Sequence, residues 1–151
     1  MSGVTMTIEG LADLDELLGA FSEATGKNIL KRTAADALVP FDAAWRAAAP
    51  VRTGRLRRSG GIGTKLSKRQ ARLAEKDSYV EVAAGPGPHP EAVQDEFGND
   101  HQAATPFVRP AWDQTNGEVA DRVASSLSQE ITKATERAAR RSQRHLAKGS
   151  G

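Results

Sequence analysis

The sequence contains no cysteine among its 151 residues. Disulfide bonds, cysteine-ligated zinc and thiol nucleophiles are therefore excluded, while the redox compartment is left open. The sequence also lacks any run of about 18 apolar residues, the length that a membrane-spanning helix requires. Its N-terminal segment has no basic start followed by an apolar stretch, so we expect no secretory signal and assembly in a cytoplasm.

Aromatic side chains are scarce, with two Trp, four Phe and one Tyr. The hydrophobic fraction, 38%, lies below the roughly 45–50% of ordinary globular domains, a range that also counts glycine. Alanine is abundant instead, so the core has to be formed by close contact between helices. Such a modest apolar supply indicates either protruding elements or surfaces that become buried on assembly.

The length predicts one domain, which we place at residues 1–146 with a flexible tail at 147–151. The β-branched segment 4–10 predicts a first strand, and apolar residues at helical spacing predict helices over 11–21 and 27–48. Pro40 predicts a kink or break near Val39, and Pro50 ends the second helix. The stripe expected on that helix consists of Leu30, Ala34, Leu38, Phe41, Trp45 and Ala48.

The second half of the sequence predicts a hairpin and a long final helix. Residues 62–66 are expected to pair with residues 79–83, and residues 67–77 to form a long charged loop. The segment 91–98 is expected to make a single helical turn, and the last helix to run from about 110 to 146. Its expected stripe consists of Trp112, Val119, Val123, Leu127, Ile131, Ala134 and Ala138. The predicted fold class is α+β: a small antiparallel sheet with two N-terminal helices and a long C-terminal helix.

The net charge of +2 conceals a strong segregation of charge along the chain. The net charge is −3 over residues 1–50, +7 over 51–77, −7 over 78–130 and +5 over 131–151. These blocks can neutralise one another within one fold, or they can join one copy of the chain to the next. A contact of the second kind is head-to-tail, and it closes into a ring when the rotation permits.

No sequence motif indicates catalysis. His89 and His101 flank three carboxylates, but no HExxH or similar metal-ligand spacing is present. The segments GPGPHP and SGGIGTK lack the glycine spacing of dinucleotide and phosphate loops, and GxSxG is absent. The neighbouring carboxylates Asp95 and Glu96 are expected on a solvated face. We therefore expect a protein without enzymatic activity, metal or cofactor.

The densest positive charge follows the second helix. We call these eight residues the basic arm: Arg52, Arg55, Arg57, Arg58, Lys65, Lys68, Arg69 and Arg72. Aromatic residues do not interleave with them, and no sequence-reading motif accompanies them, so base-specific recognition is not expected. The basic arm can contact DNA phosphates or the carboxylates of a neighbouring subunit, or it can be a solvated loop.

Four segments together resemble the neck or tail-completion family of long-tailed bacteriophages. They are APVRTGRLRRS (49–59), GPG (85–87), DEFG (95–98) and ATPFVRPAW (104–112). The resemblance covers the chain from about Leu11 to the final helix. The motif positions that it identifies are Pro50, Thr53, Gly54, Leu56, Arg57, Phe97, Gly98, Pro106, Phe107, Arg109 and Pro110.

The resemblance implies a non-enzymatic virion protein at the head–tail junction, assembled in a bacterial host. Such a protein forms a ring, here expected to be a homohexamer, through which DNA passes, and it contacts head-side connector and tail-tube or tail-terminator proteins. No membrane is involved. The alternative is a free cytoplasmic protein that binds nucleic acid without sequence preference through the basic arm and the arginines of residues 137–144.

Elementary chemistry adds three expectations about the motif positions. Gly54 is expected to adopt a backbone angle that other residues resist. Phe107 and Trp112 are expected to anchor the start of the last helix. Arg109 is expected either to pair with Asp95 or Glu96 or to stand free in solvent.

Overall fold

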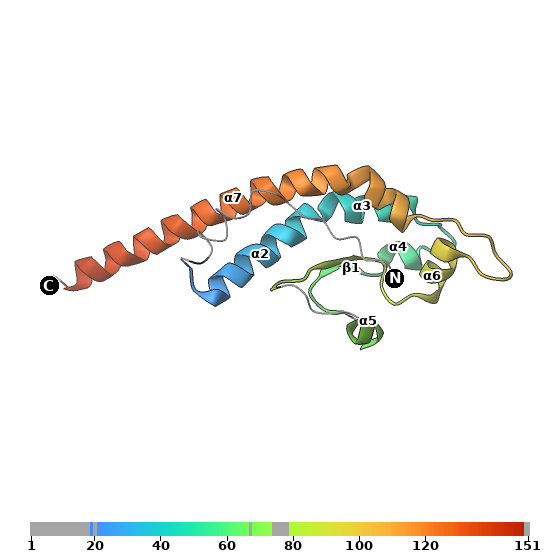
Figure 1. Cartoon of the computed structure of the whole chain (residues 1–151), viewed down its shortest axis with the longest axis horizontal. Helices are drawn as coiled ribbons and strands as arrows, with labels where there is room; N and C mark the ends of the chain where they lie inside the picture. The colour runs from blue at the N-terminus through green and yellow to red at the C-terminus, as the bar shows by residue number, and fades with distance from the viewer. Residues whose placement is uncertain (1–18, 20, 67, 74–78, 150–151) are drawn as a thin grey trace.

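The structure, a computed structural model, describes residues 19, 21–66, 68–73 and 79–149. The predicted first strand, residues 4–10, lies outside these residues, as does nearly all of the predicted first helix, 11–21. The described part of the chain is elongated, and one long helix runs along most of its length (Figure 1).

That helix is α7, Val108–Gly149, which has 42 residues. At about 1.5 Å per residue it is roughly 63 Å long. Helices α2 (Glu23–Ala37) and α3 (Val39–Ala48) lie end to end along α7 and run antiparallel to it (Figure 1). The expected bounds of the last helix are therefore too narrow, since it begins two residues earlier and ends three residues later than 110–146.

The predicted break near Val39 is confirmed. Helix α2 begins after Ser22, whose hydroxyl accepts a hydrogen bond from the Thr25 backbone N–H at 3.3 Å, and it ends at Leu38. Pro40 lies in the first turn of α3, where backbone N–H groups have no acceptor within the same helix, so the missing donor costs little. The proline thus separates two helices rather than bending one.

A short two-stranded ribbon lies beside α3. Strands β1 (Gly61–Gly63) and β2 (Ala83–Gly85) pair antiparallel, with Ile62 opposite Ala84. The predicted hairpin is therefore confirmed in kind, but the ladder is shorter than the expected pairing of 62–66 with 79–83 and its register differs by one residue. Between the strands, α5 (Lys68–Leu73) replaces the first part of the expected loop.

Two further helices flank this ribbon in the chain. Helix α4, Arg55–Arg58, is a single turn between α3 and β1, where the sequence analysis predicted no helix. Helix α6, Pro90–Phe97, has eight residues rather than the single turn expected, and it precedes the loop that leads to α7. The fold class is α+β, with a small antiparallel sheet and a long C-terminal helix. Within the described part of the chain, no helix is long and apolar enough to cross a bilayer.

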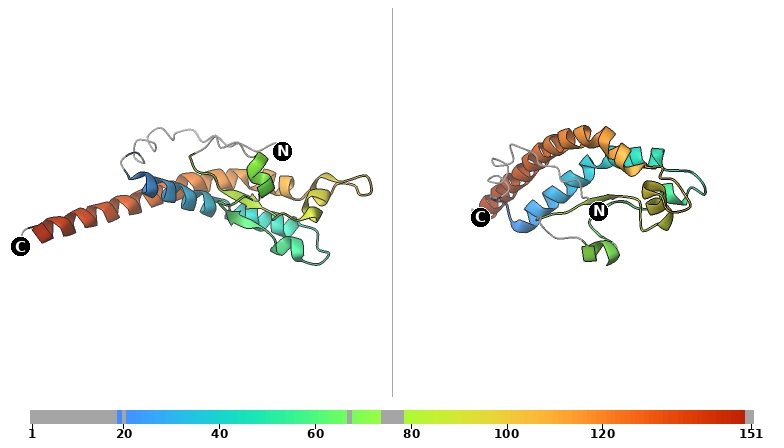
Figure 2. Two further views of the ribbon diagram at one scale, coloured as in Figure 1. Left: turned by 90° about the horizontal axis from the view of Figure 1, so that it is seen from below. Right: turned by 45° about the vertical axis from the view of Figure 1, so that its right-hand side comes forward.

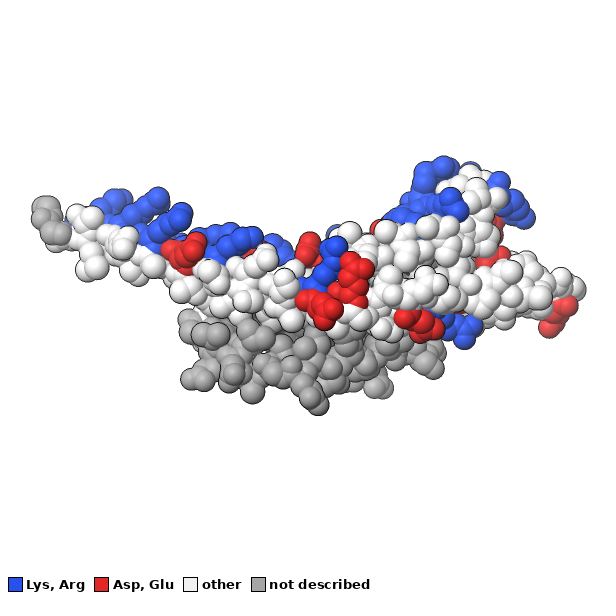
Figure 3. Space-filling model, turned by 90° about the horizontal axis from the view of Figure 1, so that it is seen from above, with Lys and Arg blue, Asp and Glu red and all other residues white. Residues whose placement is uncertain are grey.

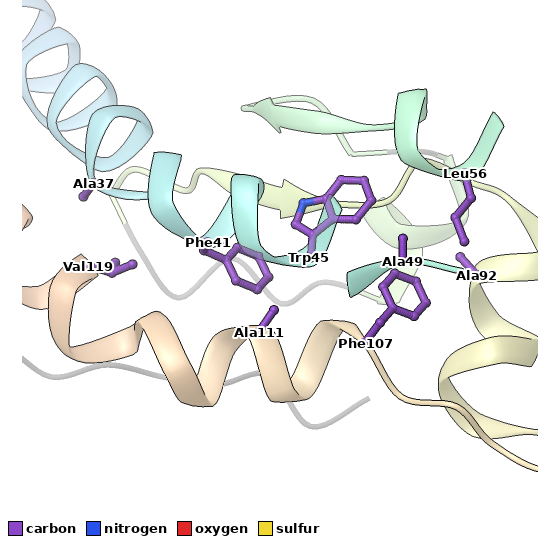
Figure 4. Close-up of a cluster of buried hydrophobic side chains, with 9 residues drawn as sticks. All are labelled: Ala37, Phe41, Trp45, Ala49, Leu56, Ala92, Phe107, Ala111 and Val119. Carbon is purple, nitrogen blue, oxygen red and sulfur yellow. The ribbon is translucent and has the colours of Figure 1, made fainter. Parts of the chain in front are cut away.

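The core consists of two clusters strung along α7. The larger one joins α3, α4, α6 and the start of α7, and its centre is Trp45, fully buried, beside Phe107 (Figure 4). Phe41 meets the edge of Trp112 at 5.5 Å between ring centroids. The smaller cluster joins α2 to α7 through Ile29, Leu127, Ile131 and Ala134. Close helix contact through alanine is visible at Ala37, Ala49 and Ala111, which are almost fully buried.

The buried stripes differ in part from those predicted. On α2 the stripe is wrong by one residue, because Ile29, Thr33 and Ala37 face α7 while Leu30, Ala34 and Leu38 lie at its margin. On α3, Phe41 and Trp45 are buried as predicted, whereas Ala48 is exposed and Ala49 is buried. On α7 the prediction includes Ala138, which is exposed because α2 does not extend that far, and it omits Ala111 and Thr115.

Candidate functional site

The most prominent surface feature is a projecting turn rich in arginine. We call residues 50–60, which contain α4 and the loop before it, the arginine corner. It stands away from α7 beyond the end of α3, and Lys and Arg side chains cover it in the space-filling view (Figures 2 and 3). Ala49 has an extended backbone, ψ 135°, which turns the chain out of α3 just before Pro50.

Arg57 and Arg46 hold the arginine corner against α3. The guanidinium of Arg57 donates to the carbonyl of Ala47 at 3.0 Å and to that of Ala49 at 3.3 Å, so it caps the C-terminal end of α3. Arg46 reaches back from α3 and donates to the carbonyls of Arg57 and Gly60. Its Nε also pairs with Asp42 at 2.8 Å. These bonds engage Arg57 within its own chain.

Gly54 supplies the backbone conformation that the loop requires. Its φ is +70°, in the left-handed region that side chains disfavour, and this confirms the expectation from the sequence. A Cβ atom at this position would stand 2.9 Å from the Arg58 guanidinium. Arg58 itself donates only a long bond, 3.5 Å, to the Thr53 carbonyl.

Arg52 and Arg55 are the outward-facing members of the arginine corner. The Arg52 side chain is 80% exposed, and its one partner among the described residues is Glu91 of α6, at 2.8 Å. The Arg55 side chain is exposed and makes no hydrogen bond or ion pair within the described part of the chain. The Arg55 guanidinium is thus available to an anionic partner, whereas that of Arg52 is exposed but already paired with Glu91.

A hollow of about 240 Å³ lies between the arginine corner and α6. It is lined by Pro50, Arg52, Thr53, Gly54, Leu56, Glu91, Gln94, Asp95 and Gln102. Its lining contains both positively and negatively charged side chains. None of the lining residues forms the arrangement that nucleophilic catalysis uses, in which a nucleophile pairs with a base that a third group orients. Across the described residues, no group of three or more His, Asp or Glu side chains could hold a metal ion. The hollow suits contact with a polar surface.

The other motif segments build a buried carboxylate joint behind the arginine corner. Glu96, at the end of α6, is 5% exposed. One of its oxygens accepts the backbone N–H groups of Phe107 at 2.8 Å and Val108 at 2.9 Å. The other accepts the N–H of Arg109 at 3.1 Å and its Nε at 3.0 Å. Glu96 therefore caps the start of α7 and satisfies three donors that a helix leaves without partners.

The electrostatics of this joint favour a charged Glu96. Burial raises the pKa of the Glu96 carboxyl, but the backbone donors of Val108, Phe107 and Arg109 and the Arg109 guanidinium outweigh it and lower the pKa below its ordinary value. The alternative in which Arg109 pairs with Glu96 is therefore the one observed. The expectation that Glu96 is solvated is wrong, because the carboxylate points inward to the first turn of α7.

Phe97 and Gly98 complete the turn after α6. Phe97 is 54% exposed, and the Arg109 guanidinium lies over its ring at 5.1 Å from the centroid. Gly98 has φ +72°, and a Cβ atom there would lie 2.8 Å from the Ala104 nitrogen, so no other residue fits without a backbone shift. Pro106 and Pro110 are exposed on either side of the buried Phe107, which confirms Phe107 as an anchor.

The eight residues of the basic arm do not form one surface. Arg52, Arg55, Arg57 and Arg58 belong to the arginine corner, whereas Lys65 lies after β1 and Lys68, Arg69 and Arg72 lie on α5. Figure 1 places α5 on the side of the ribbon away from α3 and α7. Lys65, Lys68 and Arg72 are exposed there, so the predicted single arm divides into two.

The sequence analysis missed Arg46, which holds the arginine corner in place, and it gave Glu96 as a possible partner of Arg109 but not as the cap of α7. The ion pair of Arg46 could have been predicted from the sequence, since Arg46 follows Asp42 by four residues on a helix. The sequence signal for Glu96 is weaker, because only the fold shows that the backbone of residues 107–109 meets its side chain. Comparison with protein-family models, curated proteins and solved structures finds no match to this chain.

Proposed function

We propose that this chain is a non-enzymatic, ring-forming subunit of the head–tail junction of a long-tailed bacteriophage or a related particle. The proposal rests on the resemblance of residues 49–59, 95–98 and 104–112 to the neck or tail-completion family. These segments are far apart in sequence, yet they pack around one joint between α3, α6 and α7. Motif segments that contact one another in the fold support membership of the family better than segments that lie far apart would.

The observation that carries the proposal is that some residues of the arginine corner fix it to α3 while other arginines of the corner face outward. Arg57 and Arg46 fix the corner to α3, and Gly54 sets its turn, while Arg52 and Arg55 face outward. A rigid support beneath two exposed guanidiniums is what a contact between assembled subunits needs, because little side-chain and loop ordering remains to oppose binding. Arginine also suits bidentate pairing with carboxylates.

The small hydrophobic core is consistent with a subunit that buries further apolar surface when it assembles. The described chain buries few large side chains, and exposed apolar residues such as Val51 (61%), Val93 (56%) and Phe97 (54%) lie on or beside the arginine corner and α6. In a ring, the arginine corner of one subunit would meet the acidic surface of the next, since residues 78–130 carry a net charge of −7. Apolar residues near paired charges would supply the burial that the monomer lacks.

The test is a double substitution in the genome that encodes the chain. We expect Arg52→Ala with Arg55→Ala to yield heads and tails that fail to join, seen by negative-stain microscopy as separate particles with loss of infectivity. The matched control is Arg32→Ala with Arg122→Ala, which removes two charges from surface ion pairs on α2 and α7 and should leave normal particles. Normal infectious particles from the first variant would overturn the proposal.

A further inference from the structure

The C-terminal end of α7 extends past every element that packs on it in the described structure. Ala134 is the last buried residue of α7, and all side chains from Thr135 to Gly149 are exposed. These 15 residues span about 22 Å of helix. Figure 2 shows this end projecting as a single helix beyond α2. Because no described element buries this part of α7, packing against the described residues does not explain its surface chemistry.

One side of this segment carries a line of cations, which we call the basic stripe. It consists of Lys133, Arg137, Arg140, Arg141, Arg144 and Lys148. The intervals are four, three, one, three and four residues, which at 3.6 residues per turn confine all six to an arc of about 100°. Figure 3 shows Lys and Arg gathered along one edge of this end of α7.

Neither pairing nor the helix dipole accounts for the basic stripe. Between Lys133 and Lys148 the sequence holds a single acidic residue, Glu136. Glu130, just before the stripe, already lies 3.0 Å from Arg32 and 3.5 Å from Lys133. The dipole favours cations only within the last helical turn, which here contains Lys148 and leaves Arg137, Arg140 and Arg141 outside its reach.

Repulsion between the cations of the stripe also destabilises the helix that carries them. Lys133–Arg137, Arg137–Arg141, Arg140–Arg144 and Arg144–Lys148 are like-charged pairs four residues apart. Each such pair destabilises an isolated helix by about 0.2–0.5 kcal/mol, and helical segments of this length are marginal in water on their own. An anion of high charge density along the stripe would remove this repulsion.

We propose that the basic stripe binds the phosphate backbone of double-stranded DNA without sequence preference. Phosphates recur about every 3.4 Å along each strand, so a stripe of about 22 Å can meet several of them at once. Arginine can read guanine, but no sequence-reading motif accompanies the stripe, so base-specific recognition is not expected. A protein partner fits less well, because the stripe presents no aromatic or bulky aliphatic side chain of the kind that anchors protein interfaces.

The stripe and the arginine corner lie toward opposite ends of the molecule and face the same side of it (Figure 3). DNA that follows this side would pass both. DNA binding by the stripe alone is expected of a ring subunit and of a free protein alike. It does not depend on the proposed function.

The experiment measures binding of the full chain to a fluorescein-labelled duplex of arbitrary sequence by anisotropy over a salt series. The test variant replaces Arg137, Arg140, Arg141 and Arg144 together with Gln, which keeps helix propensity and removes four charges. We expect the slope of log K against log salt to become about 3–4 units shallower. Between about 50 and 200 mM salt, the unmodified protein should then lose on the order of 100-fold more affinity than the variant.

Two control variants locate the binding. Replacing the same four arginines with Lys retains charge and should retain most of the affinity and slope, because phosphate contacts need charge more than geometry. Replacing Arg52, Arg55 and Arg58 with Gln removes charge from the arginine corner and should leave the slope set by the stripe. Circular dichroism of each variant checks that α7 still forms.

Three results would overturn the inference: no binding by the unmodified protein at low salt, an unchanged slope in the four-glutamine variant, or loss of the slope in the corner variant alone. Native mass spectrometry of the same proteins separates this outcome from the ring proposal. If the four-glutamine variant loses its oligomers while DNA binding is unchanged, the stripe is a subunit contact and the DNA inference is wrong.

Discussion

Glu96 is the residue on which the motif joint depends. It makes four hydrogen bonds to three consecutive residues, and two of its partners belong to Arg109. A buried carboxylate is normally costly, but here every acceptor direction is occupied and the helix dipole favours the charge. The same side chain links α6 to the first turn of α7, so the turn with the exposed Phe97 is fixed by it.

Replacing Glu96 with Gln should lower the free energy of unfolding by about 2 kcal/mol, because charge-assisted bonds become neutral and one oxygen acceptor becomes a donor that faces other donors. The measurement is urea denaturation followed by circular dichroism. The matched control is Glu118→Gln on the surface of α7, where Glu118 pairs with Arg122 at 3.2 Å and is 56% exposed. That change should cost less than about 0.5 kcal/mol.

The pH dependence distinguishes a charge effect from a packing effect. Because folding lowers the Glu96 pKa, its contribution is present above the ordinary value of 4.5 and is lost as pH falls through the lower, folded value. The stability difference between the unmodified protein and Glu96→Gln should therefore be full at neutral pH and shrink below about pH 4.5. A difference that stays constant down to acid unfolding would show that the charge is not responsible.

At the scale of elements, α3 and α7 approach closely because small side chains stand at their contact. Ala111 is 2% exposed and lies beside Phe41 (Figure 4). The buried aromatic residues Trp45 and Phe107 fill the space at the end of the same contact, 6.4 Å apart between ring centroids. Alanine thus determines the separation of the helices and the aromatic pair fills what remains.

Enlarging Ala111 to Leu should destabilise the protein by about 1–3 kcal/mol, since a well-packed contact accommodates added methylenes only by moving side chains or backbone. The control is Ala124→Leu on the exposed face of the same helix, which should change stability by less than about 0.5 kcal/mol because Leu and Ala have similar helix propensities. Thermal and urea unfolding of both variants check this. Equal effects would mean that the helices are not held at close packing.

The elements that sequence analysis predicted correctly are those whose signals are local. Pro40 and Pro50 end helices by their own covalent geometry, Gly54 takes a positive φ, and the apolar spacing of α7 extends over many turns. The errors concern pairing and partners. The observed pairs, such as Ile62 with Ala84, lie one residue from the register that pairing 62–66 with 79–83 implies, and the ladder ends after three pairs, which short segments without a long alternating pattern do not specify.

The site was predicted in the same uneven way. Positive charge marked the arginine corner, but the sequence did not show that Arg57 caps α3 while Arg55 faces solvent, because both follow the same helix stop. Nor did it separate the corner from α5, since a charge run in sequence carries no information about the turns within it. Arg109 was matched with the correct carboxylate only as one of several alternatives.

At the scale of the whole molecule, the arginine corner and the basic stripe lie toward opposite ends of an elongated body (Figure 3). If the arginine corner of one copy meets the acidic surface of the next, assembly should weaken steeply with salt. The Debye length falls from about 10 Å at 0.1 M to about 3 Å at 1 M, so exposed ion pairs lose most of their attraction. Sedimentation velocity of the purified protein over this range should show oligomers at low salt and monomers at high salt. Oligomers that persist unchanged would indicate an apolar contact instead.

The unequal division of the core has a mechanical consequence. The aromatic cluster holds one end of α7, while among the described residues the middle of α7 is held to α2 by a few aliphatic side chains around Ile29 and Leu127. Local opening follows the fewest buried contacts, so the pair α2–α7 should unzip from its distal end while the aromatic end stays closed. The molecule therefore has one rigid end and one end that opens more easily. In an assembly, neighbouring subunits would bind the rigid end before the α2–α7 end becomes ordered.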